Sequence, residues 1–160
     1  MADYSRKPKD SISQTFAAYE GPLKQYIGRL HLETKGKELL DIRSDIDGWL
    51  RQVHAKDGLL TIFVRHTSAS LIIQENADPR VQLDLQKALD QLAPENNHWL
   101  HCDEGPDDMP AHVKTILTSV SEQIPVLGGR MDLGIWQTVY LAEHRYEAHH
   151  RSVTLHYVGD

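Results

Sequence analysis

The chain has 160 residues, of which 40% are hydrophobic and 25% charged, as expected for one globular domain with a sizeable core. Its formal net charge of -6 argues against binding to a nucleic-acid backbone, and no apolar run is long enough to span a membrane. Cys102 is the only cysteine, which excludes an intrachain disulfide and a cysteine-rich zinc site. We therefore expect a cytoplasmic protein with neither nucleic acid nor a membrane among its partners.

The first residues are polar and show no clear period, so we interpret residues 1–22 as an arm and residues 23–160 as one domain. The domain should begin with two strands, over residues 23–34 and 38–42. Gly36, flanked by lysines, marks the turn between them.

A helix is expected next, because apolar residues recur at helical spacing from Ile46 to Val53. Ser44 is its expected N-cap, and Asp47 stands three residues later, close to a capping box. A buried strand is expected over residues 59–64, a short apolar run rich in β-strand formers. A second apolar run, at residues 71–73, predicts a further strand.

The following helix should open at Pro79 and close before Pro94. Asp78 is positioned to cap it. Its apolar residues form one stripe at helical spacing, which we interpret as a surface facing the core: Val81, Leu85, Ala88, Leu89 and Leu92.

The segment from His101 to His112 holds two histidines and four carboxylates in twelve residues. Pro110 is tolerated in a first helical turn and apolar residues follow it at helical spacing, so Asp107 and Asp108 should lead into a helix. Neutral imidazole and carboxylate are ligands for zinc, manganese and similar ions. The alternative is structural, with an aspartate that caps the helix and a hydrogen-bonded core histidine at position 101.

The rest of the chain is rich in strand signals. Gly128-Gly129 predicts a hairpin. Alternating apolar residues predict one long strand from Met131 to Leu141, with Trp136 on its other face. A last strand is expected over residues 153–158. Strands interrupted by three helices, without a repeating βαβ pattern, indicate the α+β class.

Other polar groups lie at the expected ends of strands, where a rigid scaffold can present them. His66-Thr67-Ser68 offers an imidazole and two hydroxyls after a buried strand; its alternative is a hydroxyl-capped turn with a packed histidine. Arg145 follows another strand and is suited to bind a phosphate or carboxylate, or else to form a surface salt bridge with Glu143 or Glu147.

Three remaining residues have alternative interpretations. Asn76 can cap the helix that opens at Pro79. Trp136 can stack on a heteroaromatic ring, or belong to the core or a subunit interface. No neighbour of Cys102 predicts an activated thiolate.

Over about residues 25–159 the chain resembles the YjbQ family, also called UPF0047. The resemblance rests on five separated motifs: His66-Thr67-Ser68-Ala69-Ser70-Leu71, Glu75-Asn76-Ala77-Asp78, Glu104-Gly105-Pro106-Asp107-Asp108-Met109-Pro110-Ala111-His112, Gly134-Ile135-Trp136-Gln137 and Glu143-His144-Arg145. The chain departs from the family pattern at Ile135, where threonine is usual. It also has Thr118-Ser119-Val120 where the family tends to have a Gly-Ser-Ser run.

The resemblance implies a compact α+β fold, a YjbQ-like β-sandwich with about three helices, assembled as a homotrimer. Its label implies a secondary thiamine-phosphate synthase, which joins hydroxymethylpyrimidine diphosphate to thiazole phosphate and releases pyrophosphate. The partner is then a small phosphorylated metabolite, and a divalent metal such as zinc, magnesium or manganese is the expected cofactor. The alternatives are a non-catalytic protein that binds a metal or phosphometabolite, and a metal-assisted hydrolase.

Residues and resemblance together suggest the site. We expect His66, His101 and His112 to converge on one catalytic pocket from different elements, with His101, His112 and Glu104 as metal ligands. The expected substrate-binding residues are Thr67, Ser68, Asn76, Asp107, Trp136, Glu143 and Arg145. A deep pocket that holds His101, His112 and Arg145 would favour an enzyme, and a shallow surface would favour a binding module.

Overall fold

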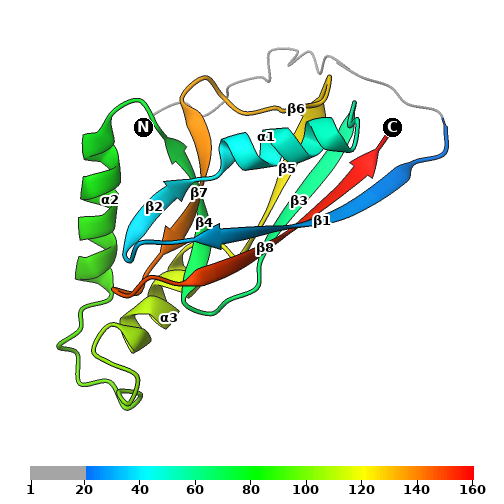
Figure 1. Cartoon of the computed structure of the whole chain (residues 1–160). Helices are drawn as coiled ribbons and strands as arrows, with labels where there is room; N and C mark the ends of the chain where they lie inside the picture. The colour runs from blue at the N-terminus through cyan, green and yellow to red at the C-terminus, as the bar shows by residue number, and fades with distance from the viewer. Residues whose placement is uncertain (1–20) are drawn as a thin grey trace, which may run out of the picture.

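The computed structural model describes residues 21–160 and folds them into two antiparallel β-sheets and three helices (Figure 1). The α+β class expected from the sequence is confirmed, and both sheets share one core. The expected arm, residues 1–22, lies almost entirely outside the described residues.

The larger sheet has the strand order β1, β8, β3, β5, β6. These strands span Lys24–Glu33, His150–Gly159, Gly58–Val64, Ser121–Leu127 and Arg130–Met131, respectively. The last strand, β8, pairs along its whole length with β1, from Lys24 opposite Gly159 to Glu33 opposite His150. β3 lies inside the sheet because it pairs with β8 on one side and with β5 on the other, in agreement with its apolar sequence.

The smaller sheet has the order β2, β7, β4, which span Glu38–Asp41, Gln137–Glu143 and Ala69–Glu75. β7 is central, and all its residues except the first are buried. Its last residue, Glu143, lies opposite Glu38 on one side and Ala69 on the other. The residues that precede β4 are therefore brought next to those that follow β7.

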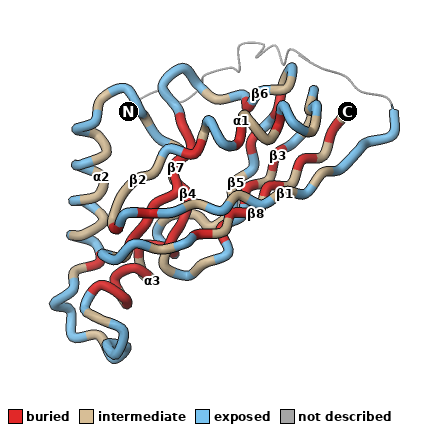
Figure 2. The backbone as a smooth tube through the Cα atoms, in the orientation of Figure 1, coloured by how far each residue is buried: buried red, intermediate tan, exposed pale blue. Residues whose placement is uncertain are grey.

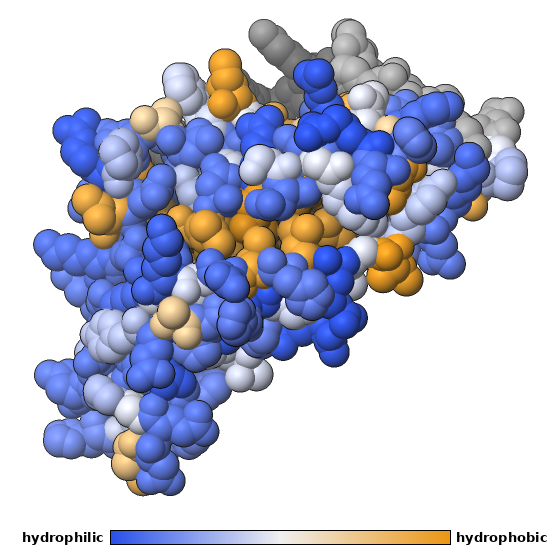
Figure 3. Space-filling model, in the orientation of Figure 1, coloured by the Kyte–Doolittle hydropathy of each residue, from blue (hydrophilic) through white to orange (hydrophobic). Residues whose placement is uncertain are grey.

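The two sheets pack around one apolar core, seen as the buried segments at the centre of Figure 2. Its fully buried side chains include Ile62 and Leu155 of the larger sheet, Leu71 and Leu141 of the smaller sheet, and Ile46 of the first helix. Burial of one such side chain stabilises a fold by roughly 1.5–3 kcal/mol, so the core fixes the relative position of the two sheets. At the edge of the sandwich between α1 and β1, a hydrophobic band remains visible at the surface (Figure 3).

The first helix, α1, spans Arg43–Gln52 and begins one residue before the expected N-cap. The cap position is Ile42, and the Asp41 carboxylate accepts a hydrogen bond from the Arg43 amide at 2.9 Å. The prediction of Ser44 as N-cap was therefore wrong, because the chain passes from β2 into the helix at once and Ser44 already lies inside it.

The second helix, α2, spans Pro79–Leu92, and its expected N-cap is confirmed: Asp78 accepts a hydrogen bond from the Arg80 amide at 2.9 Å. The prediction that its apolar stripe is core was wrong. None of its residues is fully buried, and Leu92 is 66% exposed. The helix lies at the outer side of the smaller sheet (Figure 1), so helical spacing identified the apolar face but not how much of it the fold covers.

The expected long strand from Met131 to Leu141 is interrupted, which corrects that prediction. β6 ends at Met131 and β7 begins at Gln137. Between them, the Gly134 amide donates to Gln137 Oε1 at 2.7 Å, and the Gln137 amide donates to the Gly134 carbonyl at 2.9 Å. The turn places Trp136 on the exposed surface. The prediction of one long strand failed because the alternation of apolar residues continues through the turn, whose residues do not form a strand.

The third helix, α3, spans Asp108–Leu117 and begins at the acidic segment as expected. It packs against β4 with Ala111 and Thr115 buried, while Ile116 is exposed. Among the helices of residues 21–160, none is long and apolar enough to cross a membrane.

Candidate metal centre

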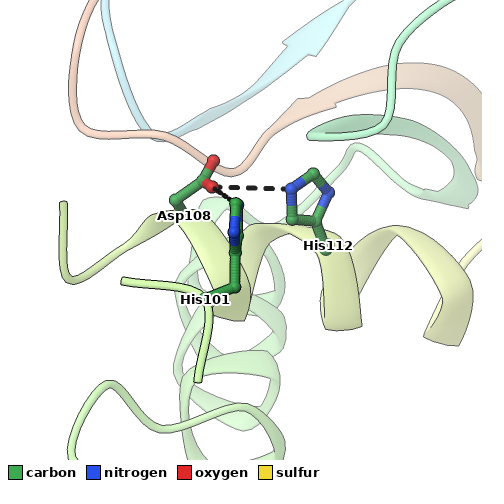
Figure 4. A group of neighbouring side chains, drawn as sticks. All are labelled: His101, Asp108 and His112. Atoms are coloured by element: carbon green, nitrogen blue, oxygen red, sulfur yellow. Dashed lines mark ion pairs between the residues drawn. The ribbon is translucent and has the colours of Figure 1, made fainter. Parts of the chain in front are cut away.

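Two histidines and one aspartate gather at the start of α3 (Figure 4). Asp108 and His112 are four residues apart on the helix and so share one face, while His101 approaches from the connection that precedes it. His101 Nε2 lies 2.7 Å from Asp108 Oδ2, and His112 Nε2 lies 3.5 Å from the same oxygen. One potential ligand atom from each residue falls within 4.8 Å of the others.

The Asp108 carboxylate is the buried member of this group, with its side chain only 3% exposed. Its Oδ1 forms an ion pair with Arg145 Nη1. Its Oδ2 accepts no hydrogen bond from the described residues and faces the two imidazole rings. A buried carboxylate oxygen without a hydrogen bond is costly, so this position favours a positive charge beside it.

The His112 ring is held by a backbone carbonyl. Its Nδ1 lies 2.8 Å from the Thr67 carbonyl oxygen, which can only accept, so Nδ1 carries a proton. In a neutral ring the Nε2 lone pair then points toward Asp108 Oδ2, and two lone pairs face each other. A proton or a cation between them removes this repulsion. A carbonyl that fixes the far nitrogen of a histidine is also the usual support for a metal-binding imidazole.

Arg145 joins the loop before α3 to the end of β7. Its guanidinium pairs with Asp107 Oδ2 at 3.1 Å through Nε and donates to the Glu104 carbonyl at 2.7 Å. Burial alone raises the pKa of Asp107, but hydrogen bonds from the Tyr146 amide and from Arg145 lower it overall, so Asp107 is ionised. Arg145 thereby fixes the backbone that carries Asp108, and its guanidinium is already committed within the chain.

A cavity of about 830 Å³ opens beside the group and is mainly apolar. His112 and Ile116 line it from α3, and Phe63 and His66 line it from the end of β3 and the loop that follows. The His66 Nε2 accepts the Ser152 amide at 2.8 Å, and burial, assisted by the positive charge of Arg151, lowers its pKa. His66 is therefore neutral, with Nδ1 as its remaining donor.

A buried ion pair supports the floor of this region. Glu143, at the end of β7, receives both Nε and Nη2 of Arg151, at 2.6 and 2.5 Å. Burial raises the pKa of Glu143, but the hydrogen bonds from Arg151, the Arg145 amide and Thr34 lower it overall. Arg151 Nη2 also donates to Ser68 Oγ at 3.1 Å, so the Glu143–Arg151 pair orients one hydroxyl of the cavity.

The expected site residues fall into separate places. His66, Thr67, Ser68 and His112 line one cavity, and His101 joins His112 at Asp108. Asn76 and Trp136 meet each other instead, because the Asn76 amide donates to the Trp136 carbonyl at 3.1 Å. They lie at the opposite end of β7 from Glu143, roughly 20 Å away at the usual rise per strand residue.

Sequence reasoning missed three residues near the site. Asp108, not Glu104, supplies the carboxylate between the histidines. Asp108 and His112 are four residues apart in a segment expected to be helical, and this spacing could have predicted that they lie side by side. Arg65 lines the cavity with an exposed side chain, and Arg151 reaches Ser68 from β8. No sequence pattern could have identified Arg151, because only the pairing of β8 with β3 brings it close to Ser68.

Comparison with known proteins identifies the family. Residues 28–160 match the family described as UPF0047 protein YjbQ-like. The chain belongs to this family. A UPF0047 protein of Synechocystis sp. is 50% identical over 132 residues, which cover 82% of this chain and 90% of that protein. The UPF0047 protein YjbQ of Salmonella typhimurium is 43% identical over 96 residues, which cover 60% of this chain and 70% of that protein.

Solved structures agree with the fold of this UPF0047 protein. A hypothetical protein of Aeropyrum pernix K1 superimposes with a TM-score of 0.78 at 30% identity, over 84% of this chain and 99% of that one. A YbjQ-like protein of unknown function from Sulfolobus solfataricus P2 gives a TM-score of 0.80 at 21% identity, over 87% of this chain and 100% of that one, and this likeness concerns the fold alone.

Proposed function

We propose that this UPF0047 protein is a metal-dependent enzyme that binds a divalent cation through His101, Asp108 and His112. The observation that carries the proposal is the buried Asp108 Oδ2, which accepts no hydrogen bond from any group of residues 21–160 and faces two imidazole nitrogens. Two imidazoles and one carboxylate are a ligand set for zinc, manganese or iron(II) that leaves coordination positions open. Magnesium is less favoured, because it prefers oxygen ligands.

The substrate we propose is a small phosphorylated molecule in the neighbouring cavity. His112 lies both at the cation position and on the cavity wall, so a ligand in the cavity can reach both. The cavity offers the hydroxyls of Thr67 and Ser68 and the guanidinium of Arg65 for phosphate oxygens. Phe63 and Ile116 offer an apolar wall for the organic part of the substrate.

The reaction we propose, following the family resemblance, is thiamine-phosphate synthesis. The bond between the pyrimidine methylene and its diphosphate oxygen breaks, the thiazole nitrogen attacks the methylene, and pyrophosphate leaves with the bonding electron pair. A bound divalent cation would supply positive charge for the leaving group. Arg65 and Ser68 would hold the phosphate oxygens, and the apolar wall would exclude water from the methylene carbon.

Metal binding is the decisive test. Calorimetry with zinc and with manganese on wild-type protein, Asp108→Asn and His112→Ala should show saturable binding only in the wild type. Loss of one of three ligands should weaken affinity by more than the ~10–100-fold caused by substitution of residues that merely support ligands. His31→Ala is the matched control, since His31 is exposed on β1 and distant in sequence from the group. Equal affinity in the wild type and Asp108→Asn would refute the metal centre.

The reaction is tested separately, by pyrophosphate release from hydroxymethylpyrimidine diphosphate and thiazole phosphate. Release should require the added metal, and it should be lost in Asp108→Asn and kept in His31→Ala. Metal binding without release would retain the metal centre and reject the synthase.

A further inference from the structure

A second hollow, lined by arginines, lies on the far side of the fold from the metal centre. It has a volume of about 580 Å³ and lies between α1 and the hairpin that joins β5 to β6. We call it the arginine pocket; the titratable residues of its lining are Arg43, Asp47, Arg51, His54 and Arg130. Figure 1 shows α1 and β6 at the opposite end of the molecule from α3.

Helical spacing assembles one wall of the arginine pocket. Arg43, Asp47 and Arg51 recur every four residues on α1 and so share one face. His54 follows in the left-handed conformation, with φ of 53°, where its amide donates to the Arg51 carbonyl and closes the helix. A glycine usually takes this position, and a larger residue there costs roughly 1–3 kcal/mol. The His54 imidazole therefore lines the arginine pocket although the backbone conformation of His54 is unfavourable.

The hairpin supplies the opposite wall. Gly128 and Gly129 have φ of 56° and 78°, which closes the tight turn and puts Arg130 across from α1. Both glycine amides already have acceptors, Asp57 Oδ1 for Gly128 and the Lys56 carbonyl for Gly129. Arg43 is partly committed as well, because its Nη1 donates to the Gln137 carbonyl at 3.2 Å. The groups left to bind a ligand are therefore chiefly the side chains of Arg51, Arg130 and His54.

The charges in the arginine pocket do not balance. Among the described residues that line it, Asp47 is the only acid, and its Oδ2 lies 3.7 Å from Arg43 Nε. Within residues 21–160, neither Arg51 nor Arg130 has a carboxylate at ion-pair distance. At least two positive charges are therefore uncompensated around one hollow of a chain whose formal net charge is -6. Like charges gathered in this way repel one another, and a bound anion removes the repulsion.

We propose that the arginine pocket binds the phosphate or diphosphate group of a small molecule. Guanidinium groups bind phosphate oxygens with two parallel hydrogen bonds, and the two uncompensated guanidiniums of Arg51 and Arg130 around one hollow suit a group with several oxygens. The volume falls within the range of roughly 300–1,000 Å³ typical of small-molecule sites. A nucleic-acid backbone would instead need an extended basic stripe. This site is separate from the metal centre and does not depend on its chemistry.

The test is calorimetry with inorganic pyrophosphate in the presence of a chelator, so that no metal links the ligand to Asp108. Wild-type protein should bind saturably. Arg51→Gln and Arg130→Gln should each weaken binding by about tenfold or more, and the double variant should abolish it, because each loses a charge-assisted hydrogen bond. Both side chains are exposed and without an ion-pair partner among the described residues, so the fold should be unaffected.

Two controls make the result specific. Arg29→Gln removes an exposed arginine from β1 and should leave pyrophosphate affinity unchanged. The double arginine variant should retain the zinc affinity of the wild type, which separates this site from the metal centre. A nucleoside diphosphate titrated in parallel distinguishes the sources of the anion: tighter binding than pyrophosphate assigns the pocket to an organic diphosphate, and equal binding assigns it to the inorganic group. Absence of saturable binding at millimolar pyrophosphate, or equal binding by wild type and double variant, would overturn the proposal.

Discussion

Replacement of Arg145 by methionine should destabilise the protein far more than replacement of a surface arginine. The Arg145 side chain is 14% exposed and pairs with Asp107 and Asp108, whose side chains are 11% and 3% exposed. Arg145→Met keeps much of the side-chain volume but leaves both carboxylates without their cation. Removal of one partner from a buried ion pair typically costs ~3–5 kcal/mol.

The expected loss lies near the lower end of this range, at about 3 kcal/mol, because one of the two carboxylates keeps a hydrogen bond. Asp107 still accepts the Tyr146 amide at 2.8 Å. Urea denaturation at fixed protein concentration measures the difference as a shift in midpoint at constant slope. Thermal unfolding should shift by roughly 6–12 °C for a chain of this length.

Arg80→Met is the matched control. Arg80 also pairs with an aspartate, Asp78 at 2.7 Å, but its side chain is 83% exposed, and a solvent-screened pair of this kind contributes little to stability. Arg145→Met combined with Asp107→Asn and Asp108→Asn should recover part of the loss, since no unpaired buried charge remains. If Arg145→Met and Arg80→Met lower the free energy of unfolding equally, the view of Arg145 as the buried counter-ion of α3 is wrong.

Three further predictions concern the whole fold. We propose a homotrimer, following the family resemblance and the exposed apolar side chains of Ile27, Leu83 and Leu92; light scattering at micromolar concentration should give three times the chain mass, and a monomer mass would contradict it. Removal of residues 1–20 should leave the melting temperature nearly unchanged, because these residues are polar in sequence; a large drop would assign the arm to the core. Gly28→Ala should destabilise the protein by about 1–3 kcal/mol, since its Cβ would lie 2.6 Å from Trp49 Cε2. Gly48→Ala is the control, because a Cβ there has room and alanine favours the helix. Equal unfolding midpoints for the two variants would show that the Trp49 side chain moves aside at no cost.

Local signals predicted the elements whose boundaries depend on local chemistry. Asp78 before Pro79 gave the start of α2, because the cap hydrogen bond lies within the segment itself. Gly128-Gly129 gave the hairpin for the same reason, since only the turn geometry decides it. The prediction that the apolar stripe of α2 is buried failed, because burial depends on which other parts of the fold, or of another subunit, cover the helix.

The candidate site was only partly predictable. The acidic segment and its two histidines were identified from the sequence. Which of the four carboxylates lies beside His101 could not be predicted from their spacing, because residues 101–107 form neither a helix nor a strand. Asp108 lies between the imidazoles because α3 begins at that residue, whereas Glu104 precedes the helix and binds Arg145 through its carbonyl. The convergence of residues 66–68 with α3 depends on the packing of α3 against β4, which brings His112 to the Thr67 carbonyl and which no local pattern reveals.

A buried histidine next to the site predicts acid sensitivity. His144 is buried, and its Nε2 lies 2.8 Å from Ser70 Oγ, which also accepts a hydrogen bond from Thr118 Oγ1. Burial, with the nearby charge of Lys114, lowers the pKa of His144 from 6.5 to about 4. The folded protein thus keeps this ring neutral under conditions in which the unfolded chain protonates it.

Proton linkage determines in which direction stability changes with pH. Between its unfolded and folded pKa, His144 binds a proton only in the unfolded state, so stability is fully present above pH 6.5 and is lost as the pH falls toward about 4. From about pH 7 to about pH 5 this one residue should remove about 2 kcal/mol of the free energy of unfolding. Asp107 and Glu143, whose pKa values are also lowered, add a loss of the same sign at lower pH.

Urea denaturation of wild type and His144→Gln at both pH values isolates the histidine. The variant starts from a lower stability if the Ser70 hydrogen bond is weakened, but its free energy of unfolding should change by about 2 kcal/mol less between the two pH values, because glutamine does not titrate. The carboxylates contribute equally to both proteins and cancel in the comparison. Parallel pH profiles would mean that His144 is protonated in the folded protein, and that the hydroxyls of Ser70 and Thr118 do not hold a neutral ring.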